Sequence, residues 1–282
     1  MSHQMIPDDS RVYCLYGFPV SHSLSPVIFN HTFEKVGING NYLAFPVKPE
    51  NLKDAVSAAR ALNFSGFNVT MPHKTRIVEL IDEVEPSARK IGCVNTVTSN
   101  SNGLVGHNTD GEGAARAIRA YGFDPKDKRL LLLGAGGSSR AIAQTLAPES
   151  DITVLSRNLE QARKIVDSTK GNGRVSYGHL TKGRFEESVT TSNLLINATP
   201  VQTVSLLKTL GSSAEKLPLG TWVFDLAYDR PLEKLPEGRR RISPLEMLVQ
   251  QAALSYEIWM QRPSPFQLMR SILVQHMGQD WK

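Results

Sequence analysis

The chain has 282 residues, of which 40% are hydrophobic and 21% charged, a length that favours two domains and a composition that excludes disordered and collagen-like proteins. Its net charge of +5 is spread along the sequence, which indicates attraction of anionic small molecules rather than a nucleic-acid surface. Because no stretch reaches the roughly 20 apolar residues of a membrane helix and residues 1–9 lack the features of a secretory signal, we expect a cytoplasmic protein that binds neither nucleic acid nor membrane.

The first 109 residues alternate between strand and helix patterns, which predicts an α/β domain that ends at residue 109. Glycines and asparagines from Asn100 to Asn108 indicate a turn. The strands are predicted at residues 11–16, 42–47 and 66–69, and the helices at residues 26–36, 51–62 and 72–81.

From Asp110 a helix leads to Gly122, and apolar strands then alternate with helical segments, as a doubly wound parallel sheet requires. This predicts a Rossmann-type dinucleotide-binding domain at residues 110–244. Helices at 245–260 and 264–277 follow without a strand between them, and we expect residues 245–282 to complete the first domain, since chain ends often lie close together. The strands of the second domain are predicted at residues 130–133, 152–155, 194–196 and 223–226.

A glycine-rich turn joins the strand at 130–133 to a helix. Gly134 and Gly136 let the backbone approach a ligand, and the helix that opens near Ser138 offers unpaired amides and a positive dipole end to a pyrophosphate. Ser139 stands where the dinucleotide fingerprint has its last glycine or alanine, and it is small enough for close helix–strand packing. The turn predicts a dinucleotide site, with a merely tight turn as the alternative.

The next strand ends in Ser156, Arg157 and Asn158, about twenty residues after the first glycine. A site for NAD needs an acidic side chain here, and none is present. Arg157 stands where a guanidinium can pair with a 2'-phosphate through two hydrogen bonds. We therefore predict NADP(H) as the cofactor, with a solvated Arg157 as the alternative.

Candidate reactive residues lie outside this turn. Ser25 before Pro26 is typical of a helix N-cap, yet a helix start with several hydroxyls also suits a carboxylate. Pro72 predicts a helix that would place Lys74 in its first turn, where the positive dipole end destabilises an ammonium and favours proton exchange; a solvated lysine is the alternative. Asp110 either caps the helix that follows it or pairs with a cationic side chain.

Other polar residues point to structure rather than chemistry. Cys14 and Cys93 lie in apolar segments, which predicts buried, inert thiols, and the seven histidines show no pairing at ligand spacing, so no metal is expected. Asn95 lies in an apolar strand and must find partners in the fold or on a ligand. The segment Arg239–Arg241 follows a Pro-Glu-Gly turn, which predicts a solvated loop.

Taken in order, these segments resemble the shikimate dehydrogenase family over nearly the whole chain. The resemblance implies an NADP-dependent oxidoreductase of aromatic amino-acid biosynthesis, a monomer or homodimer, which reversibly reduces 3-dehydroshikimate to shikimate. The matching segments are His22–Pro26, Asn68–Lys74, Val94–Thr96, Asn108–Gly111, Gly134–Arg140, Asn197–Pro200 and Met247–Ala252.

Carried over by position, the resemblance makes Lys74 and Asp110 the catalytic pair. The residues it assigns to the substrate are Ser23 and Ser25 for the carboxylate, Asn68, Thr70, Asn95 and Gln251 for the ring hydroxyls, and Tyr228 for the pocket wall. The residues it assigns to the cofactor are Gly134, Gly136, Gly137, Ser138, Ser139, Ser156, Arg157, Asn158, Thr199 and Met247.

The chain departs from the family pattern at three places. Val201-Gln202-Thr203 stand where a glycine and a methionine are usual, which predicts a differently shaped loop near the nicotinamide. Pro244 replaces a usual glycine, which weakens the expectation of a backbone contact to the nicotinamide, and the stretch between Tyr228 and Leu245 is short, as if a helix had been trimmed. The alternatives in function are a quinate/shikimate dehydrogenase that uses NAD and a catalytically silent metabolite-binding module. A nucleic-acid binder would rest on net charge alone.

Overall fold

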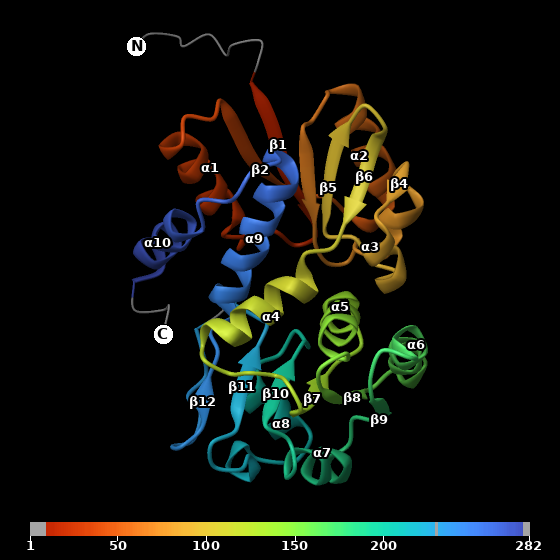
Figure 1. Cartoon of the computed structure of the whole chain (residues 1–282), viewed down its shortest axis with the longest axis vertical. Coiled ribbons are helices and arrows are strands. Elements are labelled where there is room, and N and C mark those ends of the chain that lie inside the picture. The colour runs from red at the N-terminus through yellow and green to blue at the C-terminus, as the bar shows by residue number, and fades with distance from the viewer. Residues whose placement is uncertain (1–9, 229–230, 279–282) are drawn as a thin grey trace. The chain divides into compact units, whose positions relative to one another are not determined.

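The computed structural model describes residues 10–228 and 231–278 and divides into two compact units (Figure 1). One unit extends to Thr109 and includes Ala252–Met277, and the other contains Asp110–Gln251 and Gly278. Within the described ranges, no helix is long and apolar enough to cross a membrane. The chain therefore passes between the units at Thr109 and again within one long C-terminal helix, α9 (Pro244–Met260).

The first unit contains a mixed six-stranded sheet in the order β2-β1-β3-β5-β6-β4. The strand β1 is parallel to β2 and β3, whereas β5 is antiparallel to both β3 and β6. The strands are β1 (Arg11–Gly17), β2 (Gly40–Pro46), β3 (Gly66–Val69), β4 (Glu83–Val84), β5 (Thr96–Asn100) and β6 (Gly103–His107). Most of the turn predicted at 100–108 is therefore the strand β6. Its two glycines and its histidine are not typical of a strand, so the sequence pattern does not predict one.

Helices cover both faces of this sheet because successive residues of β1 point to opposite sides. Cys14 packs with α2 (Leu52–Ala61) and α3 (Pro86–Ile91) in one core. On the other face the Tyr13 ring lies 4.7 Å from the Trp259 ring of α9, and α1 (Ser25–Lys35) packs against α10 (Phe266–Met277). Burial raises the pKa of the Cys14 thiol to about 12, so the thiol stays protonated, as expected of an inert buried cysteine.

The second unit contains a fully parallel sheet in the order β12-β11-β10-β7-β8-β9. Its first strand in the chain, β7, lies in the middle, so the strand order reverses between β7 and β10, as in a doubly wound dinucleotide-binding fold. The predicted fold class is confirmed. The strands are β7 (Arg129–Leu133), β8 (Asp151–Ser156), β9 (Val175–His179), β10 (Leu194–Asn197), β11 (Trp222–Asp225) and β12 (Arg240–Arg241).

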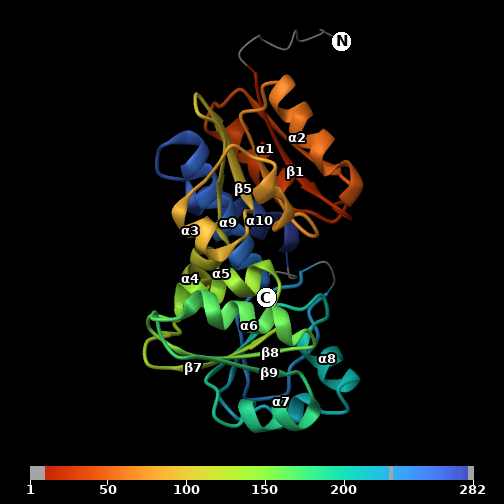
Figure 2. The same cartoon turned by 90° about the vertical axis from the view of Figure 1, so that its right-hand side faces the viewer.

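The apolar run in β7 serves two cores. Leu130 and Leu132 pack beneath α4 (Asp110–Ala120), α5 (Gly137–Leu146) and α6 (Leu159–Thr169). Leu131 and Leu133 pack against α7 (Lys182–Val189) and α8 (Thr203–Thr209) on the opposite face. Figure 2 shows α5 and α6 on one side of this sheet and α7 on the other. The strand is therefore buried on both faces, as its sequence predicts.

The helix predicted at 72–81 is wrong, and only a short 3-10 helix, η2 (Arg76–Glu79), forms there. Tertiary contacts hold this segment in another conformation. The carbonyl oxygen of Lys74 accepts the Val94 N–H at 2.8 Å, and the buried His73 ring donates to the Val47 carbonyl oxygen at 2.7 Å. Lys74 is therefore not in the first turn of an α-helix, and the helix-dipole argument for its reactivity does not apply.

The first turn of α4 makes unusually close contacts with its neighbours. A Cβ added at Gly111 would overlap Thr145 Oγ1 and stand 2.5 Å from the Ala141 carbonyl oxygen, both in α5. A Cβ at Gly113 would stand 2.7 Å from Cγ of Gln251 in α9. Glycine at these positions lets the α4 backbone approach both helices, which no larger residue permits.

Replacing Gly111 with alanine is expected to lower the free energy of unfolding by about 1–3 kcal/mol, because the added methyl group forces α4 away from α5. Urea denaturation followed by circular dichroism measures this change. Gly183→Ala in α7 is the matched control, since among the described residues nothing lies within 4 Å of its added methyl, and it should be neutral or slightly stabilising. Equal stability of the two variants would contradict the close packing.

Candidate active site

In the first unit, the start of the loop between β1 and α1, which contains Ser23, contacts the segment that precedes Lys74. A Cβ at Gly17 would overlap the Thr70 side chain, and the Phe18 N–H donates to the Met71 carbonyl oxygen at 3.0 Å. The predicted N-cap role of Ser25 is wrong, because α1 begins at Ser25 itself with Leu24 as N-cap.

The two predicted substrate-binding serines, Ser23 and Ser25, lie at the start of that helix. The Ser25 N–H donates to Ser23 Oγ at 3.3 Å, and both residues are partly exposed. Two hydroxyls at the amino end of an 11-residue helix form a surface suited to a carboxylate.

Asn68 is held in place by residues from three distant segments. Its Nδ2 group donates to Thr96 Oγ1 at 3.0 Å and to Ser255 Oγ at 3.1 Å, and the Tyr42 hydroxyl donates to its Oδ1 at 2.8 Å. Sequence reasoning missed Tyr42 and Ser255, which lie 26 and 187 residues from Asn68. Such a network fixes the orientation of the amide at the edge of the predicted substrate site.

Asn95 finds its partners within the fold. Its Nδ2 donates to Thr109 Oγ1 at 2.9 Å, and the Thr109 N–H donates back to Asn95 Oδ1 at 2.9 Å. The side chain is buried, so these bonds offset its desolvation. Because Thr109 immediately precedes Asp110, Asn95 also anchors the chain just before α4 begins.

Asp110 is a fully buried residue of the predicted site. Within the second unit its carboxylate accepts a hydrogen bond from Ser138 Oγ to Oδ2 at 3.1 Å and a close one from Gln251 Nε2 to Oδ1. Three predicted site residues from α4, α5 and α9 are thus brought together. Since Asp110 is also the first residue of α4, the helix dipole further favours its negative charge.

The glycine-rich turn leaves its backbone open at the start of α5. Gly134 has a φ of 99°, a value that favours glycine, and its N–H donates to the Leu155 carbonyl oxygen at 2.9 Å. Gly136 is the N-cap of α5, and no atom of the described residues lies within 4 Å of the place a Cβ would take. The amides of Gly137 and Ser138 open the helix, whereas Ser139 is buried beneath it. These features fit a dinucleotide pyrophosphate.

The end of β8 presents Arg157 to solvent. Asn158 caps α6 by accepting the Gln161 N–H at 3.0 Å, and its own N–H donates to the buried Ser156 Oγ at 3.1 Å. Arg157, between them, is exposed. The two polar neighbours therefore fix the loop while the guanidinium is available to an anion.

The remaining predicted residues differ in their surroundings. Thr199 Oγ1 donates to Asn197 Oδ1 at 2.7 Å, which shapes the turn after β10. Tyr228 is partly exposed after β11. Met247 is only 5% exposed and belongs to the core beneath α4–α6. Of the three, Met247 is the least accessible to a ligand.

A buried carboxylate that sequence reasoning missed joins the ends of β10 and β11. Asp225 is 1% exposed and accepts hydrogen bonds from Asn197 Nδ2 and from the Thr203 N–H, each at 2.8 Å. Arg241 Nη1 lies 3.2 Å from its other oxygen. Thr203, one of the departures from the family pattern, therefore has a structural role. No local sequence signal marks this carboxylate, because Thr203 and Arg241 lie 22 and 16 residues from Asp225 in the chain.

The prediction of a solvated loop at Arg239–Arg241 is wrong. Arg240 and Arg241 form β12, and the Arg240 guanidinium lies 5.2 Å from the Trp222 ring centroid. Arg239 Nε donates to the Leu217 carbonyl oxygen at 2.9 Å. Each arginine has a partner that the sequence pattern alone does not reveal, so the cluster stabilises the edge of the sheet.

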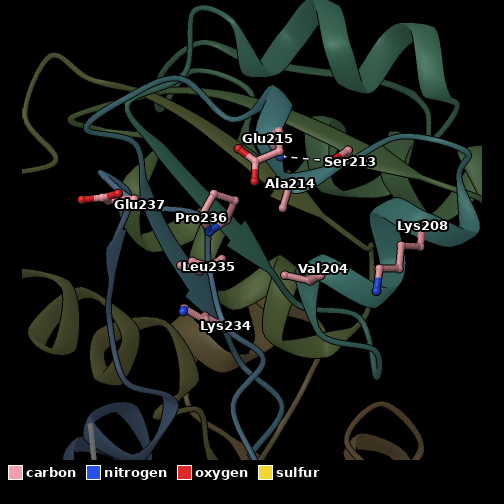
Figure 3. A pocket seen from close by; sticks show the side chains of 9 residues that line it. All are labelled: Val204, Lys208, Ser213, Ala214, Glu215, Lys234, Leu235, Pro236 and Glu237. Carbon is pink, nitrogen blue, oxygen red and sulfur yellow. Dashed lines mark hydrogen bonds between the residues drawn. The ribbon is translucent and has the colours of Figure 1, made fainter.

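A separate hollow of the second unit contains none of the predicted residues. It lies between α8 and residues 234–237 and carries Lys208 and Lys234 opposite Glu215 and Glu237 (Figure 3). These two positive and two negative side chains balance, so the hollow does not favour an anionic dinucleotide.

A parallel sheet in this strand order, with an open glycine-rich turn after its first strand, defines a Rossmann-type dinucleotide-binding protein. Family models narrow this class. The shikimate dehydrogenase substrate binding domain matches residues 15–97, shikimate / quinate 5-dehydrogenase matches residues 116–240, and the shikimate 5'-dehydrogenase C-terminal domain matches residues 245–273.

Relatives match over almost the full length. The shikimate dehydrogenase (NADP(+)) of Geobacillus sp. (strain WCH70) is 38% identical and aligns over 95% of this chain and 99% of its own. A crystal structure of shikimate dehydrogenase in complex with NADP+ is 32% identical, with a TM-score of 0.84 and 98% of each chain covered. The shikimate 5-dehydrogenase of Listeria monocytogenes in complex with shikimate and NAD is 31% identical, with a TM-score of 0.84 and coverage of 97% of this chain and 99% of that one. The chain belongs to the shikimate dehydrogenase family.

Replacing Arg241 with methionine is expected to lower the free energy of unfolding by about 3–5 kcal/mol, because it leaves the Asp225 carboxylate buried beside no cation. The two side chains are 14% and 2% exposed. Arg174→Met, which breaks a 2.7 Å pair with Asp151 whose side chains are 86% and 43% exposed, should change stability by about 0–1 kcal/mol. Thermal unfolding of the two variants compares them directly, and a similar small loss in both would show that Asp225 does not depend on Arg241.

Proposed function

We propose that the protein catalyses the reversible reduction of 3-dehydroshikimate to shikimate with NADPH. The observation that carries this proposal is the buried Asp110 carboxylate, hydrogen-bonded to Ser138 in the opening turn of the dinucleotide-binding helix. It supplies a fixed anionic group beside the predicted cofactor site. The identity of the substrate is supported by the relative named shikimate dehydrogenase (NADP(+)), which aligns with 95% of this chain.

The cofactor is proposed to bind along the carboxyl edge of the parallel sheet. The turn at Gly134, Gly136 and Gly137, which leaves open space at Gly136, suits the pyrophosphate, with Ser138 and Ser139 in the helix that follows. The exposed Arg157 suits the 2'-phosphate, and none of the three residues at the end of β8, Ser156–Asn158, is an acidic residue that would favour NAD. The residues that complete the site are Ser156, Asn158, Thr199 and Met247.

The substrate is proposed to bind through hydroxyl and amide groups. Ser23 and Ser25 at the start of α1 receive its carboxylate. The groups proposed for its ring hydroxyls and pocket wall are Asn68, Thr70, Asn95, Gln251 and Tyr228. The proposed substrate domain is 1–109 with helices 245–282, and the proposed cofactor domain is 110–244, in a cytoplasmic monomer or homodimer.

Lys74 and Asp110 are proposed to carry out the proton transfer of the reaction. Bound NADPH supplies the hydride that reduces the ring ketone. The Lys74 ammonium donates a proton to the ketone oxygen as charge develops there, so that the C=O bond becomes a C–OH group and the lysine is left neutral until solvent reprotonates it. Asp110 accepts hydrogen bonds from the reacting groups and orients them. In the reverse direction the neutral lysine takes the hydroxyl proton.

Steady-state oxidation assays with shikimate or quinate, each with NADP or NAD, test this function. We expect the highest kcat/KM with shikimate and NADP, followed as growth of nicotinamide absorbance. Higher efficiency with quinate or with NAD would overturn the proposed specificity. Absence of turnover with every pair, in a folded protein that still binds shikimate, would instead favour a silent metabolite-binding module.

Replacing Lys74 with alanine is expected to lower kcat by about 10² to 10⁴, because the proton donor is lost, while the KM for shikimate changes little. Lys208→Ala in α8, at the charge-balanced hollow, should leave kcat unchanged. An unimpaired kcat in the Lys74 variant would exclude this lysine as the proton donor.

A further inference from the structure

We propose that the Ser138 hydroxyl is a positioning group for catalysis, which orients the Asp110 carboxylate from the opening turn of the cofactor helix. The inference rests on the proposed function and deepens it. Family resemblance assigns Ser138 only to cofactor binding, whereas the structure directs its hydroxyl to the carboxylate of another helix at 3.1 Å.

The two carboxylate oxygens of Asp110 receive neutral donors from two different helices. Ser138 of α5 donates to Oδ2, and Gln251 of α9 donates to Oδ1. Because both oxygens are held by donors from different helices, the plane of the carboxylate is defined rather than free to rotate. Hydrogen bonds to an ionised group are roughly twice as strong as neutral ones, so each donor contributes substantially to that orientation.

Close backbone packing determines the positions of the Ser138 and Gln251 donors. Gly111 allows the first turn of α4 to approach the Ala141 carbonyl group of α5, and Gly113 allows α4 to approach Gln251. The three helix segments therefore form one closely packed group around Asp110. A displacement of the opening turn of α5 would move the Ser138 donor relative to the carboxylate.

This arrangement connects cofactor binding with catalysis. The amides that suit the pyrophosphate belong to the same turn of α5 as the Ser138 hydroxyl. A dinucleotide that orders this turn would also order the donor to Asp110. The role differs from that of a direct phosphate ligand, because removal of the hydroxyl should then impair turnover rather than cofactor affinity.

The test compares Ser138→Ala and Ser138→Thr with the wild type. We expect the alanine variant to lower kcat for shikimate about tenfold, the effect of losing one hydrogen bond to a charged group. The Kd for NADP should change less than about twofold. Threonine keeps the hydroxyl and should restore most of kcat. Ser168→Ala in α6, whose hydroxyl donates to the Ile165 carbonyl oxygen, should behave as wild type.

A double-mutant cycle with Asp110→Asn shows whether Ser138 acts through Asp110. We expect Ser138→Ala to cause little further loss of kcat in the Asp110→Asn background. Multiplying effects, or a raised Kd for NADP with unchanged kcat, would overturn the inference and leave Ser138 as a cofactor ligand. An inactive wild type would overturn the proposed function and this inference together, whereas an active wild type with unimpaired Ser138→Ala would overturn this inference alone.

Discussion

A carboxylate removed from water must be compensated, and the surroundings of Asp110 show how the second unit does so. The residue is fully buried at the start of α4, where the helix dipole favours a negative charge. Ser138 and Gln251 supply a donor to each oxygen. Those donors reach it because Gly111 and Gly113 let α4 pack closely on α5 and α9. The close packing of α4 on α5 therefore determines where the Asp110 carboxylate lies relative to the glycine-rich turn.

The strand order of the second unit's sheet explains why a ligand can reach the glycine-rich turn after β7. In the order β12-β11-β10-β7-β8-β9, β7 is central. The strands that follow it in the chain, β8 and β9, lie on one side of it, and the later strands β10 to β12 lie on the other. The crevice at such a reversal lies outside the carboxyl ends of the strands. Asp225, Asn197 and Arg241 then fasten the ends of β10, β11 and β12 through a buried polar network. In the first unit, side-chain hydrogen bonds of Asn68 and Asn95 likewise join separate segments of the chain.

Much of this was predictable from sequence because it depends on local pattern. Four consecutive leucines followed by glycines predict a doubly buried strand and an open turn, and the structure contains both. The helix expected after Pro72 does not form, because its groups bond elsewhere. The Lys74 carbonyl oxygen accepts the Val94 N–H, and the His73 ring donates to the Val47 carbonyl oxygen. Tyr42 and Ser255 were missed for a related reason: their contacts with Asn68 join segments far apart in the chain. The arginines at 239–241 likewise have partners distant in the chain, which the charge pattern alone does not indicate.

A high-resolution crystal structure of the ternary complex with NADP and shikimate would show directly whether Asp110 links the cofactor turn to the substrate. We expect Asp110 to keep its hydrogen bonds to Ser138 and Gln251. We also expect the pyrophosphate to lie on the opening amides of α5 and a shikimate hydroxyl to lie within hydrogen-bond distance of the same carboxylate. An Asp110 side chain turned away from both donors, or a dinucleotide bound away from the turn at Gly134–Ser139, would contradict this link.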